Sequence, residues 1–256
     1  MEYRNLKVDI QDHVAVLTIA HPPANAFDLV TMQDLTNALD ALAHDPEVRV
    51  LVLTGDGEKC FSAGFDVADS ENQDVTGPMG RDTWTKLDRY EKPVIAAMNG
   101  HALGGGLELA LCCHFRIAAE NPKTRIGLTE LNLGIIPGWG GTQRLMRAVG
   151  KQKALDMILF SRRLSPAEAL EIGLVQQVCP QDKLMDEAMD LAATLARRPP
   201  IAVGSVLRAM SAGEYENMDR GLEVEGEGSA RVRESEDRTE GFNAFLEKRE
   251  PEFKGK

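Results

Sequence analysis

The chain has 256 residues, 43% of them hydrophobic and 27% charged, which predicts an ordinary globular protein with one large domain or one domain plus an appendage. Its net charge of −11 argues against nucleic acid as a partner, because phosphate binding requires a basic face. Its apolar runs are too short for a membrane span, and the N-terminus lacks a signal-peptide pattern. The four cysteines lack metal-ligand spacing. We therefore expect a cytoplasmic protein with reduced thiols and without a metal site.

The first quarter of the chain predicts strand, helix and strand in α/β order. Leu6 to Ile10 and Val14 to Ile19 alternate in polarity and predict an N-terminal hairpin. Apolar residues then recur at helical spacing from Leu29 to Leu42, before a buried strand at Val48 to Thr54. This order predicts a right-handed βαβ unit and an α/β architecture.

The next segment is polar. Residues 69–80 contain Gly77-Pro78 and predict a mobile surface loop. A helix through Trp84, Leu87 and Tyr90 is expected to follow it.

A glycine turn at Gly104 to Gly106 comes next. It follows a buried strand, Val94 to Met98, and precedes a helix-forming run that contains Glu108. Glycine allows another group to approach the backbone, and the first N–H groups of a helix are unpaired. Such a turn can bind an anion, or an oxygen that is becoming one.

Beyond this turn we expect a strand at Phe115 to Ala119 and a helix that Gly140-Gly141 opens. From Lys151 onward helical patterns dominate and the sequence shows no internal repeat. The expected elements are helices at 154–160, 166–172, 182–196 and 201–210, and one strand at 174–178. We therefore predict an α/β core over residues 1–190 and a C-terminal helical region over 191–256, where the apolar face of a last helix needs cover from its own domain or another subunit.

A second turn, Ser62-Ala-Gly-Phe-Asp66, also follows a hydrophobic strand. Each can offer a free backbone N–H, and two such donors converging on one oxygen form an oxyanion hole. Two carboxylates, Glu108 and Glu130, follow along the chain. The spacing alone does not show that the two turns and the two carboxylates meet in the fold.

At these residues the chain resembles the crotonase (enoyl-CoA hydratase/isomerase) superfamily. The resemblance spans essentially the whole chain in the right order, and the ordered set of motifs is far more specific than any one glycine cluster. The matching segments include Phe61-Ser-Ala-Gly-Phe-Asp-Val67, Ala102-Leu-Gly-Gly-Gly-Leu-Glu-Leu-Ala110, Leu133-Gly-Ile-Ile-Pro-Gly-Trp-Gly-Gly-Thr-Gln-Arg-Leu145 and Glu240-Gly-Phe-Asn-Ala-Phe-Leu-Glu-Lys-Arg249.

The resemblance implies a spiral of ββα units, a C-terminal helical trimerisation region, and homotrimers that often pair into homohexamers. It implies an acyl-CoA thioester as substrate, with coenzyme A as part of that substrate and no separate cofactor. The oxyanion hole would consist of the backbone N–H groups of Phe65 and Gly105. Phe65 replaces a small residue that is common in hydratases, so its ring is expected to narrow or cap the acyl pocket.

The resemblance also implies a set of substrate-binding residues. Ala68 stands where a lysine is often found, which puts one phosphate or adenine contact in doubt, and Lys248 is a further candidate for a phosphate contact across a subunit boundary. The expected set is Ala24, Ala26, Ser62, Gly64, Asp66, Val67, Ala68, Gly104, Trp139 and Lys248. Phe65, Trp84, Trp139 and the 69–80 segment are expected to shape the acyl pocket.

The two carboxylates distinguish the possible activities. Hydratases carry glutamates at the positions of Glu108 and Glu130, and hydration needs both a base for water and an acid for C2. Glu130 is favoured as the proton donor. A Δ3-Δ2 enoyl-CoA isomerase needs only one base and remains an alternative, as does a non-catalytic member that binds acyl-CoA or RNA.

Other chemistry-bearing residues have simpler interpretations. His101 is expected to pack or to hydrogen-bond structurally, and Cys60 is expected to be a packed thiol. Ser62 imitates a serine-hydrolase elbow, but a cysteine replaces the first glycine of that motif. Gly100 to Gly106 does not match the dinucleotide-binding pattern.

Overall fold

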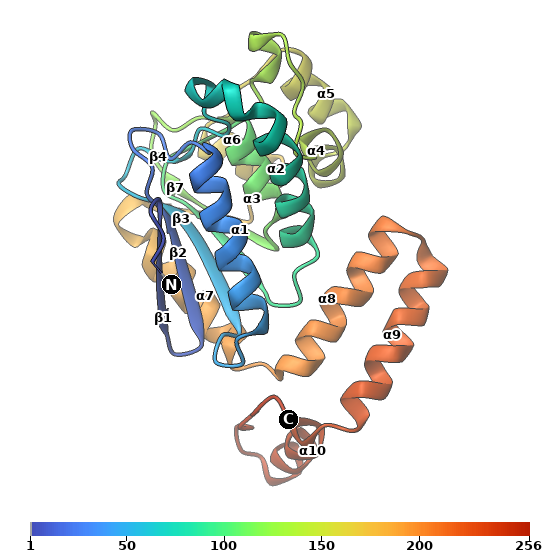
Figure 1. Cartoon of the computed structure of the whole chain (residues 1–256). Coiled ribbons are helices and arrows are strands. Elements are labelled where there is room, and N and C mark those ends of the chain that lie inside the picture. The colour runs from blue at the N-terminus through green and yellow to red at the C-terminus, as the bar shows by residue number, and fades with distance from the viewer. Residues whose placement is uncertain (1) are drawn as a thin grey trace.

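A computed structural model describes residues 2–256 of the chain, which form two sheets, a shell of helices and a projecting helical arm (Figure 1). The larger sheet has the strand order β1-β2-β3-β5-β7-β9, and the smaller one has the order β4-β6-β8. Among the paired strands of residues 2–256, only β1 and β2 run antiparallel. The strands are β1 (Leu6–Gln11), β2 (Val14–Ile19), β3 (Val50–Gly55), β4 (Cys60–Ser62), β5 (Val94–Met98), β6 (His101–Leu103), β7 (Phe115–Glu120), β8 (Ile126–Gly127) and β9 (Gln177–Pro180).

Successive ββα turns build the core. In each turn one strand joins the larger sheet, the next joins the smaller sheet, and a helix follows: β3-β4-α2, β5-β6-α3 and β7-β8-α4. The helices are α1 (Leu29–His44), α2 (Gln73–Asp88), α3 (Gly105–Cys112) and α4 (Gly141–Val149). The N-terminal hairpin and the parallel β2-α1-β3 unit are confirmed, as is the ββα spiral.

The central strands of the larger sheet, β3 and β5, are buried on both faces, which explains why they are almost entirely apolar. Side chains alternate along β3, so Leu51 and Leu53 face the main core while Val50 and Val52 face the opposite side. There α7 (Leu184–Ala196) covers the sheet with small buried residues, Ala188, Ala192 and Ala196.

Shorter elements complete the core. The helices α5 (Lys151–Leu159) and α6 (Pro166–Glu171) follow α4, and the 3-10 turns are η1 (Val67–Asn72), η2 (Glu130–Leu133) and η3 (Gln181–Lys183). Ser165 and Glu168 form a capping box at the start of α6.

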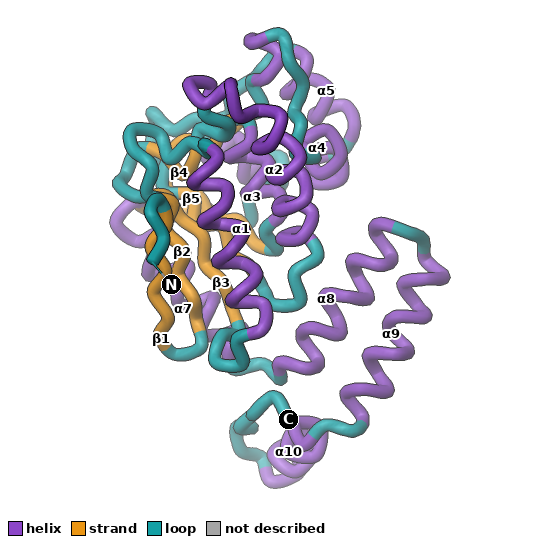
Figure 2. The backbone as a smooth tube through the Cα atoms, viewed as in Figure 1, coloured by secondary structure: helices purple, strands orange, loops and turns teal. Residues whose placement is uncertain are grey.

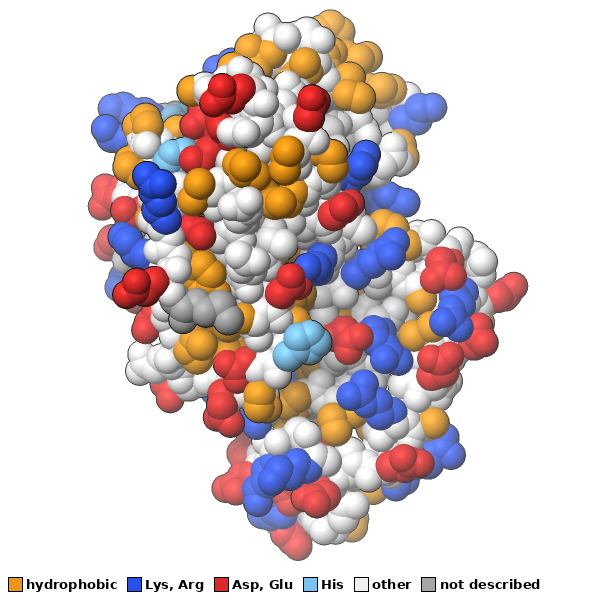
Figure 3. Space-filling view, in the orientation of Figure 1, with side chains coloured by type: hydrophobic (Ala, Val, Ile, Leu, Met, Phe, Trp, Pro, Cys, Tyr) orange, Lys and Arg blue, Asp and Glu red, His pale blue; other side chains and the backbone are white. Residues whose placement is uncertain are grey.

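The C-terminal arm, residues 200–256, extends away from the core (Figures 1 and 2). It consists of the antiparallel pair α8 (Pro200–Tyr215) and α9 (Met218–Arg233), followed by α10 (Glu236–Glu247). The expected boundary at residue 190 falls inside α7, which belongs to the core by its packing. The face of the arm seen in Figure 3 carries interspersed acidic and basic side chains.

The prediction of a mobile loop at 69–80 is wrong, because η1 and the first half of α2 occupy this segment. Gly77 and Pro78 weaken a helix locally, but tertiary packing outweighs them. Thr76 is buried, and Gly80 lies so close to the indole of Trp139 that a Cβ at Gly80 would stand 2.4 Å from the ring.

The strand expected at 174–178 begins three residues later, at Gln177. Leu174 and Val175 are apolar because they pack into the main core after α6, in a turn rather than a strand.

Candidate active site

Two turns that are distant in sequence meet at the start of α3. Gly64 lies against Gly105, and a Cβ at Gly64 would stand only 2.4 Å from the Gly105 nitrogen. Gly64 has φ +85° and Gly104 has φ +53°, a backbone region that favours glycine. The structure therefore brings together the two segments that the sequence singled out separately.

Backbone pairing holds the first of these turns in place. Phe27 N–H donates to the Gly64 carbonyl at 2.7 Å, and Asp66 N–H donates to the Phe27 carbonyl at 3.0 Å. Ala63 N–H donates to the Ala24 carbonyl at 3.0 Å. Ala24, in the turn at residues 22–25, thus helps to fix the backbone before Phe65, whereas the Ala26 carbonyl lies 2.7 Å from the His21 Nδ1.

Within residues 2–256, the backbone N–H groups of Phe65 and Gly105 have no hydrogen-bond acceptor. In the bridge between Phe27 and Phe65, the donors are the N–H groups of Phe27 and Asp66 instead. Gly105 is the first residue of α3, where an N–H has no partner within the helix. The Trp84 indole N–H donates to the Gly105 carbonyl at 3.2 Å and fixes that peptide from behind.

Glu108 lies one turn into α3 and is 2% exposed. Its Oε1 accepts hydrogen bonds from the backbone N–H groups of Trp139, at 2.9 Å, and Gly141, at 2.7 Å. Desolvation raises the pKa of Glu108 to about 7, the two N–H donors oppose that rise, and the charge of Glu130 adds to it. This carboxyl is therefore poised to exchange a proton near neutral pH.

Glu130 opens η2 and is 9% exposed. It faces the glycine turn, since a Cβ at Gly104 would lie 3.1 Å from its Oε1. Its Oε2 is buried without a hydrogen-bond partner among the described residues, and burial raises the pKa of the carboxyl. A buried carboxyl oxygen without a partner favours the protonated form.

A largely buried ion pair braces the loop that holds Glu108. Arg144 on α4 donates through Nε to Asp88 at 2.7 Å and through Nη1 to the Trp139 carbonyl at 2.7 Å. The N–H of Trp139 is one of the two donors to Glu108. Asp88, Arg144 and the Trp139 peptide thus form a chain of hydrogen bonds that ends at the carboxylate.

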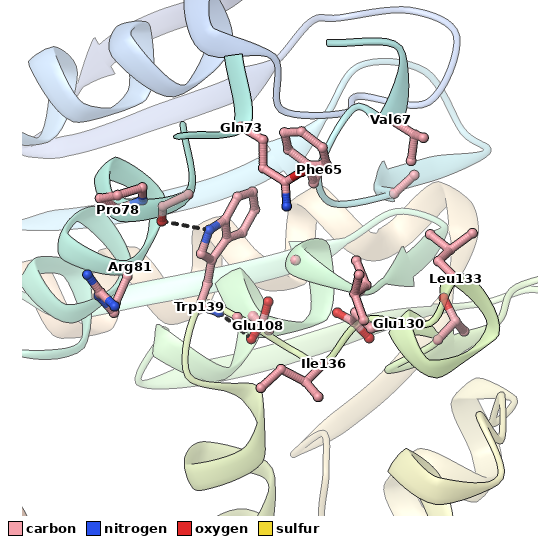
Figure 4. Close-up of a pocket in the computed structure, with 17 residues that line it drawn as sticks. Phe65, Val67, Gln73, Pro78, Arg81, Glu108, Glu130, Leu133, Ile136 and Trp139 are labelled. Carbon is pink, nitrogen blue, oxygen red and sulfur yellow. Dashed lines mark hydrogen bonds between the residues drawn. The ribbon is translucent and has the colours of Figure 1, made fainter. Parts of the chain in front are cut away.

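Both carboxyls and both free N–H groups line one cavity of about 400 Å³ (Figure 4). The rings of Phe65 and Trp139 meet edge to face, with centroids 6.3 Å apart, at one of its walls. Seven of the expected site residues line it: Phe65, Val67, Gly104, Gly105, Glu108, Glu130 and Trp139.

The other expected residues lie outside the cavity lining. Ser62 Oγ accepts from the Gly64 N–H at 3.1 Å, and Asp66 caps η1 by accepting from the Ala68 N–H at 3.0 Å, so both shape the turn. Lys248 directly follows α10, a helix of the arm that lies well away from α2 and α3 of its own chain (Figure 1). A contact from a neighbouring subunit, as expected for Lys248, stays a prediction.

The 69–80 segment, which was expected to shape the acyl pocket, contributes Gln73, Gly77 and Pro78 to the lining, although as the start of α2 and not as a loop. Arg81, further along this helix, was not predicted to line the cavity. Thr129 and three apolar residues after Glu130 were also missed as lining residues. The lining residues that were not predicted include Arg81, Thr129, Leu133, Ile135 and Ile136. Trp84, which was expected to shape the pocket, is fully buried behind it.

The interpretations of His101 and Cys60 agree with the structure. The His101 ring Nδ1 accepts from the Arg125 N–H at 3.0 Å, and burial raises the pKa of the Cys60 thiol to about 11. Over residues 2–256 no acidic, histidine and cysteine side chains group as metal ligands would. Across the same residues, no helix has the length and apolar character needed to cross a bilayer.

The chain is similar to known proteins over nearly its whole length. A model of the enoyl-CoA hydratase/isomerase family matches residues 9–256. The chain is 41% identical to a probable enoyl-CoA hydratase of Bacillus subtilis (strain 168) over 98% of both chains, and 39% identical to a crotonyl-CoA hydratase of Syntrophomonas wolfei over 99% of both. A crystal structure of enoyl-CoA hydratase from Bacillus anthracis matches with a TM-score of 0.94 and 41% identity, over 99% of this chain and 100% of the other. The chain belongs to the enoyl-CoA hydratase/isomerase family, the crotonase superfamily.

Proposed function

We propose that the protein is a 2-enoyl-CoA hydratase, which adds water across the conjugated double bond of an acyl-CoA thioester to give the 3-hydroxyacyl-CoA. The observation that carries this proposal is the pair of buried carboxyls, Glu108 and Glu130, in one cavity with two unpaired backbone N–H groups. The names of the relatives, enoyl-CoA and crotonyl-CoA hydratases, support the same reaction.

The thioester oxygen is proposed to bind between the N–H groups of Phe65 and Gly105. When a nucleophile attacks C3, the electrons of the double bond move toward this oxygen and form an enolate. Donors that are already in place stabilise that charge without reorganising, and one such donor contributes roughly 10²- to 10³-fold in rate.

The two carboxyls are proposed to divide the proton transfers. Glu108, held by two N–H donors that favour the ionised form, takes a proton from water as the water oxygen bonds to C3. Glu130, with a buried oxygen lacking a partner, gives its proton to C2. Proton exchange between the two carboxyls and solvent then restores the starting state, so the net reaction is addition of one water.

Coenzyme A is proposed to be held as part of the substrate, without a separate cofactor. Val67 and Ala68 are exposed beside the cavity, where a pantetheine chain would enter. The backbone of Ala24 and Asp66 supports this rim.

We further propose a homotrimer or homohexamer in the cytoplasm. The arm exposes apolar side chains on all three of its helices, a pattern of surfaces that become buried on assembly. They include Val206, Met210, Met218, Leu222, Phe242, Phe245 and Leu246. The four cysteines are free and buried, which supports a reducing compartment.

Incubation with crotonyl-CoA tests the proposed reaction. A hydratase removes the absorbance of the conjugated thioester, whereas an isomerase acts on a 3-enoyl-CoA and creates that absorbance. Loss of the signal from crotonyl-CoA is the expected result. An enzyme that leaves crotonyl-CoA intact but converts the 3-enoyl-CoA would be an isomerase.

A further inference from the structure

One face of α2 forms a wall of the cavity and carries a cation. Gln73, Gly77 and Arg81 are spaced four residues apart and all line the cavity, as side chains on one helix face do. At about 1.5 Å per residue this face extends for roughly 12 Å. Of the 17 lining residues, Arg81 is the only lysine or arginine.

Arg81 has no ion-pair partner and no side-chain hydrogen bond within residues 2–256. Its backbone carbonyl accepts from the Thr85 hydroxyl, but the guanidinium has no acceptor there. By contrast, Lys86 on the same helix pairs with Asp40. An unpaired guanidinium beside a cavity, in a chain of net charge −11, is free to bind an anion from outside the chain.

The position of Arg81 relative to the carboxyls indicates which part of a substrate it meets. In Figure 4 Arg81 and Pro78 lie on one side of Trp139, and Glu130 and Leu133 lie on the other. The lining residues Pro78, Ile136 and Trp139 are apolar. A thioester placed at the Gly105 N–H therefore has an apolar wall available for its acyl chain, with a cation at the far side.

We propose that Arg81 binds a carboxylate at the distal end of the acyl chain, so that the preferred substrates are 2-enoyl-CoA thioesters of dicarboxylic acids. This inference rests on the proposed hydratase function. A guanidinium can bind a carboxylate through two parallel hydrogen bonds, a geometry that lysine lacks. A plain alkyl chain would leave this cation without a partner.

A pair of matched substrates tests the inference. 2-Hexenoyl-CoA and 2-hexenedioyl-CoA have the same number of acyl carbons and the same coenzyme A, and differ only in the terminal carboxylate. The wild type should have the higher kcat/KM for 2-hexenedioyl-CoA. Arg81→Met should lower that value by roughly 10- to 100-fold, the scale of a hydrogen bond to a charged group, and should lower the value for 2-hexenoyl-CoA far less.

Two further variants complete the design. Lys86→Met removes a charge from the same helix at a residue that does not line the cavity, and should change neither substrate. Arg81→Lys keeps the charge and should retain part of the preference. Because Arg81 is exposed, its variants should melt at the wild-type temperature, which separates lost recognition from lost folding.

The possible outcomes distinguish a failure of the Arg81 inference from a failure of the proposed hydratase function. Equal losses for both substrates would mean that Arg81 contacts the shared coenzyme A, and would overturn the inference. A wild type that hydrates 2-hexenoyl-CoA but does not prefer 2-hexenedioyl-CoA would overturn it too, while leaving the hydratase function intact. A wild type that hydrates neither substrate would contradict the proposed function itself.

Discussion

The core and the arm bury their apolar residues to very different extents. In the core, every residue of the site helix α3 is buried within the single chain, and Glu108 on this helix is 2% exposed. In the arm, Phe245 is 83% exposed and Leu246 is 77% exposed. The carboxyls and N–H donors are thus assembled by a single chain, whereas the arm presents surface that another copy can cover.

This difference separates changes that should stop the chemistry from changes that should alter assembly.

Glu130→Gln should lower kcat with crotonyl-CoA by roughly 10²- to 10⁴-fold, because the amide cannot donate the proton that C2 requires. Its melting temperature should stay close to that of the wild type, since the shape of the side chain is kept. Glu71→Gln, an exposed residue of η1, is the control and should have wild-type activity. Unchanged turnover in Glu130→Gln would reject its role as the acid.

Gly64→Ala should lower kcat by roughly 10²- to 10³-fold, because the added Cβ would press on the Gly105 nitrogen and separate the two N–H donors. Gly57→Ala is a matched control, with a similar φ of +81° but no atom within 4 Å of the new Cβ. Both variants carry backbone strain, so a comparison of kcat and melting temperature isolates the oxyanion hole. Equal activity in the two variants would contradict the proposed hole.

Arg144→Met should reduce the free energy of unfolding by about 3–5 kcal/mol, because it leaves the Asp88 carboxylate buried without its partner. It should also lower kcat, since the Trp139 peptide that binds Glu108 loses its brace. Urea denaturation measures the first effect. Adding Asp88→Asn should recover part of the stability, and a lack of recovery would contradict the ion-pair explanation.

The value of kcat/KM should fall by about tenfold for each pH unit below about 7, because protonation removes Glu108 as the base. The raised pKa also makes the native state bind more protons than the unfolded chain between about pH 4 and 7. The stability that Glu108 contributes is therefore fully present below about pH 4 and is lost as the pH rises through about 7. Glu108→Gln should lack this component of the stability profile, and an identical profile would count against the shift.

Phe245→Asp combined with Leu246→Asp should give the smallest change in the core and the largest change in assembly. Two charges on this exposed face of α10 should weaken association and shift the mass measured by light scattering toward the monomer. Circular dichroism should show the helix and strand content of the wild type. An unchanged mass would place the subunit interface elsewhere.

Sequence patterns that are local in the chain predicted much of the site. The strand, glycine turn and helix around Gly105 follow one another directly, so both the free N–H and Glu108 could be identified there. The hydrogen bonds that hold Glu108 could not, because Trp139 and Gly141 lie 31 and 33 residues further along the chain. Only the spiral of ββα turns, which leaves no repeat in the sequence, brings these groups together.

The start of α2 was missed for a related reason. Gly77 and Pro78 carry a turn-like local preference, and the contact of Gly80 with the Trp139 ring is a tertiary effect. That error concealed Arg81, since a residue beyond a mobile loop gave no reason to expect a cation in the cavity wall.

Hydration in water labelled with heavy oxygen tests the central claim most directly. Crotonyl-CoA incubated with the wild type should gain one labelled oxygen at C3, and Glu108→Gln and Glu130→Gln should each slow that gain by orders of magnitude. A wild-type product without labelled oxygen, or full labelling rates in both variants, would contradict the account of a two-carboxyl hydratase.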